Sequence, residues 1–291
     1  MKDLTNISVL REMLRRHGIT LSKGMGQNFL INPSVCPRMA EESGVDGNAG
    51  ALEIGPGVGV LTAELAGRAK RVAAIELDRR LEPLLKENLD EFSNVDLIFG
   101  DALELDLHNI IRDRFSDCDK VIVCANLPYY ITSPIIMRLL EQRLPVDAVT
   151  VMVQREAAER MCAQVGSREA GAITVAVRYF SEPRMLSRVS PGSFLPPPKV
   201  ESAVMRLDVR DPEAVGWGLE AGAQEVFWKL VKAGFGQRRK TLPNAAGSIF
   251  GKELVAEALA AAGLSESARI EQLSMEQLFD IARELYQRKT L

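Results

Sequence analysis

The sequence predicts an α/β fold, with a mostly parallel sheet covered by helices on both faces, followed by a small all-α domain. Short apolar runs alternate with segments of helical period in the first half of the chain, two β-rich stretches follow, and only helical patterns remain from residue 211 onward. Alternation of this kind is typical of parallel sheets, whose buried strands need crossover helices. We therefore expect one domain over residues 1–210 and a second over residues 211–291.

The predicted elements follow one another in a regular order, after an amphipathic helix near the start. Strands are expected at "GALEIG", "RVAAIEL", "VDLIFGD", "KVIVCANLP" and "AVTVMVQ", with helical patterns such as "VLTAELAGRA" and "RRLEPLLKENLDEF" between them. The β-rich stretches "AITVAVRYFSEPRMLSRV" and "SAVMRLDV" are expected to complete the sheet as an antiparallel edge. Glycines and Pro243 then separate the helices of the second domain.

The sequence predicts a soluble, cytoplasmic protein, and a monomer is our expectation, although the sequence does not establish the oligomeric state. Hydrophobic residues make up 46% of the 291 residues, enough for a sizeable core. The first residues lack the apolar core of a secretory signal, and no apolar run approaches the roughly 18 residues of a membrane span. The 4 cysteines show no C-x-x-C pairing and there are 2 histidines, so we expect neither a zinc site nor a disulfide framework.

Charge is spread unevenly, although the formal net charge is only −3. Basic residues gather in "REMLRRHG", near the proline-rich turn that contains Lys199, and in "GQRRK", which holds Arg238, Arg239 and Lys240. Each cluster has two interpretations, a solvated helix face or a surface that binds phosphates. Phosphate binding is our hypothesis for Lys199, Arg238, Arg239 and Lys240.

A glycine-rich turn follows the first strand of the predicted sheet, in "EIGPGVGVLTAEL". Gly55, Gly57 and Gly59 let the backbone bend tightly and approach a ligand at the edge where open α/β sheets bind one. The spacing is G-x-G-x-G, not the G-x-G-x-x-G of dinucleotide folds, and a purely structural turn is the alternative.

Two acidic residues end the next two strands. About twenty residues beyond the glycines, Glu76 is placed to accept both hydroxyl hydrogens of a ribose, which would serve NAD and S-adenosylmethionine equally. Asp101 could accept from the exocyclic amine of an adenine, or could cap a helix.

The stretch "NLPY" distinguishes between those cofactors. Pro128 favours an extended Leu127, so the Asn126 amide oxygen and the Leu127 carbonyl can converge on one amine. Two fixed acceptors would orient the lone pair of an adenine N6 toward an incoming methyl group. Tyr129 offers a ring face for the extruded base, and Phe194, which looks exposed between glycine and prolines in "SPGSFLPPPKV", could cover its other face. A core anchor is the alternative for Phe194.

Together these motifs resemble those of the ribosomal RNA adenine N6-dimethyltransferases, most closely the bacterial enzymes of the small subunit. The resemblance covers nearly the whole chain, through "GQNFL", "EIGPGVGVLT", "IELD", "GDAL", "NLPYYITSPI", "VQREAAERM", "GSFLPPPKVESAV" and "FGQRRKTL". It implies a Rossmann-like class I methyltransferase domain with an N-terminal extension, and a helical domain that binds RNA or the ribosome. It also implies S-adenosylmethionine as methyl donor, held by residues at Gln27, Asn28, Leu30, Gly55, Gly57, Glu76, Leu77, Asp101, Ala102 and Asn126.

The same resemblance implies two adjacent adenosines in the hairpin loop near the 3′ end of small-subunit rRNA as acceptors, each methylated twice. The partner would be the small-subunit particle or its precursor. One alternative is the related group that methylates one adenine of large-subunit rRNA. Another is an assembly factor whose methylation is incidental. An NAD oxidoreductase is disfavoured, because the chain lacks the second half of a dinucleotide fold.

Overall fold

The computed structural model describes residues 4–20 and 28–290. The chain divides into two compact units. The first comprises Met1–Ala158 with Pro183–Val209, and the second comprises Glu159–Glu182 with Arg210–Leu291. The sequence suggested a single boundary near residue 210, whereas in the structure residues 159–182 belong to the helical unit.

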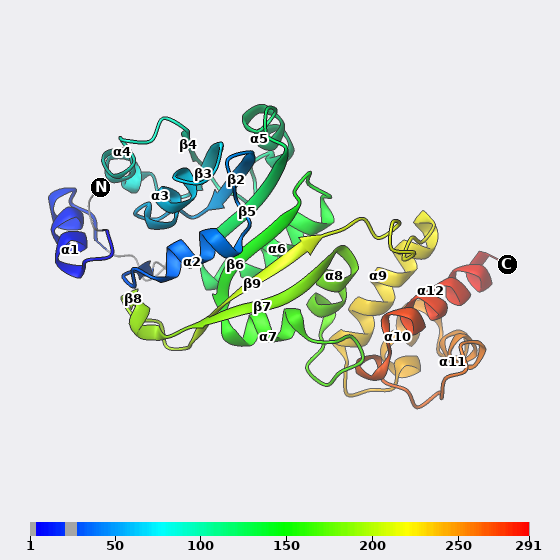
Figure 1. The fold of residues 1–291 in the computed structure, drawn as a ribbon. Helices are drawn as coiled ribbons and strands as arrows, with labels where there is room; N and C mark the ends of the chain where they lie inside the picture. The colour runs from blue at the N-terminus through cyan, green and yellow to red at the C-terminus, as the bar shows by residue number, and fades with distance from the viewer. Residues whose placement is uncertain (1–3, 21–27, 291) are drawn as a thin grey trace. The chain divides into compact units, whose positions relative to one another are not determined.

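Seven strands of the described chain form one sheet in the order β4-β3-β2-β5-β6-β9-β7. β2, β3, β4, β5 and β6 run parallel, and β9 pairs antiparallel with β6 (Figure 1). This confirms the predicted parallel sheet and its antiparallel edge. The strands are β2 (Ala49–Ile54), β3 (Arg71–Glu76), β4 (Val95–Phe99), β5 (Lys120–Asn126), β6 (Ala148–Gln154), β7 (Ser181–Val189) and β9 (Ser202–Val209).

Helices cover both faces of the sheet. Successive side chains of a strand point to opposite faces, so the apolar strands present side chains that need cover on both sides. Ala49 and Ala51 of β2 belong to a buried cluster with α2 and α3, whereas Gly50 faces the ring of Phe115 at the end of α5. A Cβ on Gly50 would lie 2.5 Å from that ring, so only glycine fits there. The helices of the first unit are α1 (Ile7–Arg16), α2 (Val35–Glu42), α3 (Val60–Ala66), α4 (Glu82–Asn88), α5 (Leu107–Arg114) and α6 (Thr132–Glu141), and the boundary between the units falls within α7 (Arg155–Cys162).

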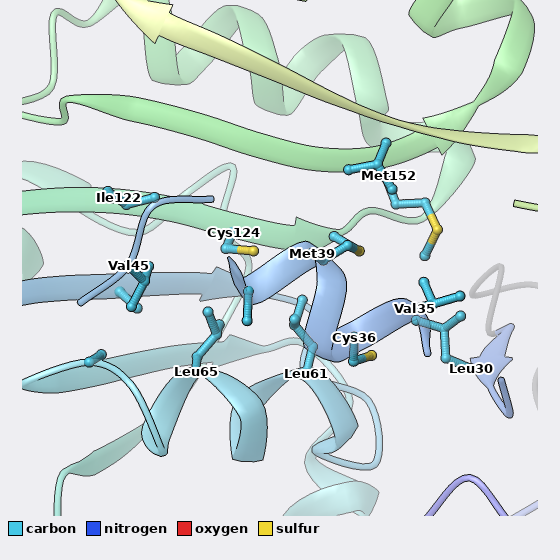
Figure 2. Packing of buried hydrophobic residues seen from close by; sticks show 14 of the residues in the cluster. Leu30, Val35, Cys36, Met39, Val45, Leu61, Leu65, Ile122, Cys124 and Met152 are labelled. Carbon is cyan, nitrogen blue, oxygen red and sulfur yellow. The ribbon is translucent and has the colours of Figure 1, made fainter. Parts of the chain in front are cut away.

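A buried hydrophobic cluster packs α2 and α3 against one face of the central strands. Figure 2 shows Met39 of α2 and Leu61 and Leu65 of α3 packed beside Ile122 and Cys124 of β5. Burial of such side chains stabilises a fold by about 1.5–3 kcal/mol each relative to exposure. The carboxyl ends of the central strands are therefore held in fixed positions.

A second, two-stranded sheet joins segments far apart in the sequence. β1 (Phe29–Leu30) pairs antiparallel with β8 (Phe194–Leu195), so that Leu30 lies opposite Phe194. The side chain of Asn32 extends the connection by donating to the Ser193 hydroxyl at 3.1 Å. This pairing brings the N-terminal segment against the loop that carries Phe194.

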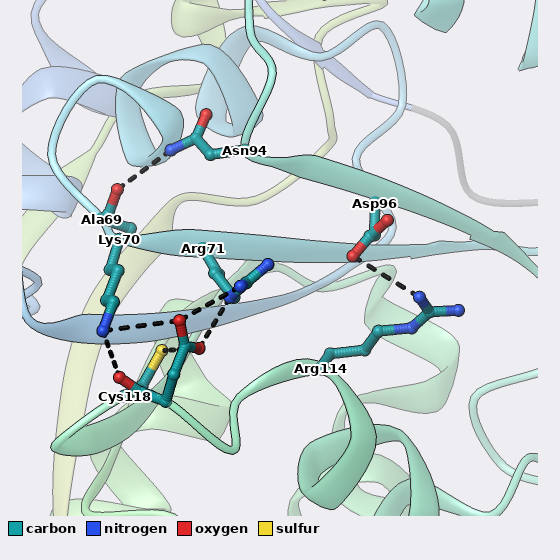
Figure 3. Close-up of polar contacts among 8 residues, drawn as sticks. Ala69, Lys70, Arg71, Asn94, Asp96, Arg114 and Cys118 are labelled. Atoms are coloured by element: carbon teal, nitrogen blue, oxygen red, sulfur yellow. Dashed lines mark hydrogen bonds and ion pairs between the residues drawn. The ribbon is translucent and has the colours of Figure 1, made fainter.

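Charged side chains gather at the amino ends of the strands, as Figure 3 shows. Asp117 accepts from Arg71 Nε at 2.7 Å and also pairs with Lys70, and Arg71 holds the pKa of Asp117 at about 2. Arg114 and Asp96 form another ion pair. Arg71 begins β3 and Glu76 ends it, so this cluster lies at the opposite edge of the sheet from the site described below.

The second unit is helical and includes one element that the sequence misassigned. The stretch "AITVAVRYF", expected to be β, is the helix α8 (Ala172–Phe180). The Gly171 N–H donates to the Thr174 hydroxyl at 2.9 Å at its start, and Tyr179 packs against the rings of Phe227 and Trp228. Burial against α9 outweighs the strand preference of the β-branched residues. The other helices are α9 (Ala221–Gly236), α10 (Leu242–Phe250), α11 (Lys252–Ala261) and α12 (Met275–Thr290).

None of the helices in the described ranges combines the length and apolarity that a membrane crossing requires.

Candidate active site

A pocket opens at the carboxyl ends of the central strands, where the strand order reverses between β2 and β5. This switch point is the usual ligand site of open α/β sheets. The empty space within it, counted with its solvent-open mouth, is about 1050 Å³. The predicted catalytic and donor-binding residues that the structure describes all line it, namely Asn28, Leu30, Gly55, Gly57, Glu76, Leu77, Asp101, Ala102, Asn126, Leu127, Pro128, Tyr129 and Phe194. Gln27 lies outside the described residues.

The glycine turn after β2 forms one wall of the pocket. Gly55 has a φ of 75°, which favours glycine, and a Cβ there would meet only Pro128, at 3.8 Å, on the pocket side. Gly57, with a φ of 60°, lies under the Phe29 ring, which a Cβ would approach to 3.1 Å. A side chain at Gly55 would therefore occupy space that the turn leaves to a ligand.

Glu76 is the last residue of β3 and is only 7% exposed. Its Oε1 accepts from the Asp78 N–H at 2.8 Å, and its Oε2 accepts from the Gly57 N–H at 3.1 Å. Burial raises its pKa, and these backbone hydrogen bonds act in the opposite direction. Each carboxylate oxygen has a further lone pair, so Glu76 can accept from a diol while it braces the glycine turn.

Asp101 follows β4 and caps a turn, because its Oδ1 accepts from the Leu103 N–H at 2.8 Å. The helix-capping alternative is wrong, since α5 begins at Leu107 and its cap is Asp106. The turn fixes the side chain of Asp101 beside Ala102 in the pocket wall. The turn uses only Oδ1, so the Oδ2 of Asp101 can accept a hydrogen bond from a ligand.

The segment Asn126–Tyr129 forms the opposite wall. Asn126 ends β5, where its backbone lies in register with Met152 of β6. Its side chain makes no hydrogen bond with any described residue. Pro128 leads into a short 3₁₀ turn, Tyr129–Ile131, which is closed by the Ile131 N–H donating to the Pro128 carbonyl at 3.1 Å. The Tyr129 hydroxyl lies 2.6 Å from that of Ser202 on β9. The ring of Tyr129 is thus oriented, whereas the Asn126 amide is available as an acceptor.

Phe194 corrects one expectation. The sequence suggested an exposed ring between Gly192 and the prolines, but Phe194 is 2% exposed and belongs to the buried cluster on the α2/α3 face. Its pairing with Leu30 across the two-stranded sheet turns the ring inward. Phe194 both packs in the core and lines the pocket.

Glu53, Cys36 and Tyr130 are among the lining residues that were not predicted. Glu53 lies in β2 at 1% exposure with its Oε2 unbonded to any described group, and burial raises its pKa to about 8, although the Thr62 hydroxyl beside it acts in the opposite direction. Cys36 is fully buried, and Tyr130 is 56% exposed. The signal for Glu53 was available, because "GALEIG" places one charged residue in an otherwise apolar strand.

The predicted RNA-binding residues do not line this pocket. Arg238 belongs to the helical unit, where its Nε donates to Glu271 at 2.7 Å and its terminal nitrogen donates to the Arg168 carbonyl. Arg239 and Lys240 are exposed and form no ion pair with a described residue. Lys199 is exposed in the proline-rich loop of the first unit. Part of the charge in "GQRRK" is thus neutralised within the protein.

Within residues 4–20 and 28–290, no group of acidic, histidine or cysteine side chains is arranged to hold a metal ion.

Two solved structures share the fold. The 23S rRNA methyltransferase ErmE is 28% identical, with a TM-score of 0.67 over 89% of this chain and 99% of that one. A dimethyladenosine transferase from Plasmodium falciparum is 25% identical, with a TM-score of 0.74 over 90% and 98%. The fold and its pocket therefore define a class I methyltransferase, as predicted.

The family can be stated more narrowly. The family model described as ribosomal RNA adenine dimethylase matches residues 19–287, and the chain belongs to that family. Curated relatives named ribosomal RNA small subunit methyltransferase A include those of Anoxybacillus flavithermus, 40% identical over 98% of this chain and 97% of the relative, and Alkaliphilus oremlandii, 42% identical over 98% and 99%. The protein is an rRNA adenine dimethyltransferase.

Proposed function

We propose that the protein dimethylates N6 of two adjacent adenosines in the 3′-terminal hairpin loop of small-subunit (16S) rRNA, with S-adenosylmethionine as donor. The observation that carries this proposal is the Asn126 amide, which has no partner among the described residues and faces the same pocket as Glu76 and Asp101. The small-subunit substrate is supported by the names of relatives that are 40–42% identical over nearly the whole chain.

The donor side of the pocket fits S-adenosylmethionine. The space beside Gly55 admits a ligand that a Cβ would obstruct, and Glu76 keeps acceptor capacity for two ribose hydroxyls. Asp101 has an oxygen left for an adenine amine, and Leu77 and Ala102 provide apolar surface. When bound, S-adenosylmethionine supplies an electrophilic methyl group.

The acceptor side orients the nucleophile. The Asn126 amide oxygen and the Leu127 carbonyl accept the two N6 hydrogens, which directs the nitrogen lone pair into the pocket. Tyr129, whose ring is held by Ser202, supplies one face for the extruded base, and the pocket-lining edge of Phe194 supplies contact on the other side. Neither acceptor needs to be a strong base.

The RNA is held by charges outside the pocket. No lysine or arginine is among the described residues that line it, so we assign phosphate binding to Lys199, Arg239 and Lys240, which are exposed. Arg238 also binds a phosphate when its ion pair with Glu271 is broken. We further infer that the helical unit binds the small-subunit particle or its precursor, and that the protein acts in the cytoplasm as a monomer.

The test is methyl transfer to unmethylated small subunits. Purified protein is incubated with donor carrying a labelled methyl group, and the modified nucleotides are mapped. We expect two adjacent dimethylated adenosines near the 3′ end of the small-subunit rRNA. Large subunits are the matched control, because label there in place of the small subunit would favour the ErmE type of substrate. Naked rRNA tests whether the assembled particle is required.

A further inference from the structure

Tyr130 is an exposed aromatic side chain at the mouth of the pocket. Its exposed fraction is 56%, the largest among the exposed large hydrophobic residues of the described chain, and it lines the pocket together with Tyr129. No described residue hydrogen-bonds to its hydroxyl. Its ring therefore contributes little to packing within the protein.

The turn that carries Tyr130 keeps the ring in place. Tyr129–Ile131 form a 3₁₀ turn closed onto the Pro128 carbonyl, and α6 follows directly at Thr132. With three residues per turn, successive side chains of such a turn point about 120° apart. Because the Tyr129 ring is held by Ser202, the Tyr130 ring cannot share its position. One rigid turn thus presents two rings to the same pocket.

An RNA strand in this pocket has a use for both rings. The base that reacts must leave its stack to reach Asn126, and its covalent neighbour then loses a stacking partner. That neighbour cannot enter the pocket and must lie at its mouth, where Tyr130 is exposed. Aromatic side chains can stack on any base, with modest preferences that follow the stacking strength of the base.

We propose that Tyr130 stacks on the nucleotide next to the adenosine being methylated, and so positions the RNA at the pocket mouth. This inference rests on the proposed function. Tyr129 contacts the reacting base, whereas Tyr130 is a positioning residue that acts on its neighbour. The two adjacent acceptor adenosines would each serve as the neighbour of the other on one side.

The experiment compares Tyr130→Ala, Tyr130→Phe and Tyr130→Trp with the wild type on unmethylated small subunits. Tyr130→Ala should slow methylation about 5- to 150-fold, the range for loss of one base–aromatic stack. The Phe and Trp variants should stay within a few-fold of the wild type, and affinity for the donor should be unchanged in all three. The control is Ile7→Ala, which removes an exposed apolar side chain that does not line the pocket.

The neighbour is then varied on the RNA. In small subunits with one acceptor adenosine replaced by guanosine or uridine, the wild type should prefer the better-stacking guanosine neighbour, and Tyr130→Ala should lose that preference. Independently, 2-aminopurine at the neighbour position of a synthetic hairpin should be quenched on binding wild type but not Tyr130→Ala.

Three results on methylation and RNA binding would overturn the inference, and a fourth on donor binding would do so as well. The three are an unchanged rate for Tyr130→Ala, an undiminished preference for guanosine, or equal quenching by the two proteins. Weaker donor affinity in Tyr130→Ala would also overturn it, by assigning the ring to the donor. Absence of methylation by the wild type on intact small subunits would instead refute the proposed function, and the quenching test would still report on Tyr130.

Discussion

The wall of the pocket that carries Glu53, Glu76 and Asp101, here called the donor wall, differs from the acceptor wall, which carries Asn126–Tyr130 and Phe194. The difference lies in how many of their polar side chains form hydrogen bonds within the protein. On the donor wall, Glu76 accepts two backbone N–H groups and Asp101 closes a turn, so both carboxylates are fixed by the chain itself. On the acceptor wall, the Asn126 amide has no described partner and Tyr130 is exposed to solvent. The difference indicates that changes at Glu76 and Asp101 disturb folding as well as binding, whereas changes at Asn126 and Tyr130 leave folding largely intact.

The largest effect is expected at Glu53, the buried carboxyl of the donor wall. Its pKa is raised from 4.5 to about 8 in the folded protein. Between those pH values the unfolded state ionises while the folded state keeps its proton, so stability falls as pH rises and levels off above about 8. The loss is roughly 1.4 kcal/mol for each pH unit of that interval. Glu53→Gln, which stays neutral, should lack this slope in urea unfolding between pH 5 and 8. Parallel profiles for the two proteins would mean that Glu53 ionises normally.

Phe194 is the one acceptor-wall residue named here whose replacement should lower stability, because its ring is also part of the hydrophobic core. Phe194→Ala should lower the free energy of unfolding by about 3–5 kcal/mol, as expected for a fully buried ring. Phe194→Leu should retain most of that stability and still methylate slowly per folded molecule, since it has no ring to stack. Normal turnover by Phe194→Leu would restrict Phe194 to a structural role.

Asn126 tests the acceptor wall directly. Asn126→Ala should slow methyl transfer by ~10²–10³, the scale for loss of one preorganised hydrogen-bonding group in a transition state. Donor affinity and melting temperature should change little, because the side chain supports no described residue. Asn126→Asp keeps an acceptor oxygen and should be faster than the alanine variant in single-turnover assays. A fall in stability as large as the fall in rate would remove the contrast between the walls.

Glu76 should show the opposite behaviour. Glu76→Ala should weaken donor binding by roughly 1.5–3 kcal/mol, the loss of a charge-assisted hydrogen bond, and should also lower stability because the N–H groups of Gly57 and Asp78 lose their acceptor. Glu76→Gln keeps one acceptor oxygen and should be intermediate in both. Calorimetry for the donor and thermal unfolding measure the two effects. Unchanged donor affinity in Glu76→Ala would make the residue purely structural.

The smallest effect is expected for residues that bind the RNA backbone. Neither wall of the pocket carries a lysine or arginine among its described residues to neutralise the phosphate charge. Changing Arg239 and Lys240 together to Gln should lower the log–log salt slope of RNA binding by up to ~2 units. Arg238→Gln is the control, since Arg238 already pairs with Glu271 and should lower the slope less. An unchanged slope for the double variant would mean that these cations belong to a solvated helix surface.

The sequence predicted the parts of the site that lie close to strand ends. Gly55, Glu76, Asp101 and Asn126 each follow an apolar run, and parallel strands bring their carboxyl ends to one edge. Periodicity alone was therefore enough to predict that they meet.

What the sequence did not predict depends on contacts between distant segments. The burial of Phe194 comes from its pairing with Leu30, and α8 is helical because Tyr179 packs on Phe227 and Trp228. The neutralisation of Arg238 likewise comes from Glu271, which is distant in the chain. None of these partners can be assigned from local pattern.

The pairing of β1 with β8 also has a consequence for the time course of synthesis. Asn32 and Ser193, which bond beside this pairing, are separated by 161 residues. Chains are synthesised at roughly 5–20 residues per second, so on the order of 10–30 s pass between the emergence of one partner and the other. By then the residues of β2, β3 and β5 have all been made. On the growing chain, the donor wall can assemble first, and Phe194 closes the pocket late.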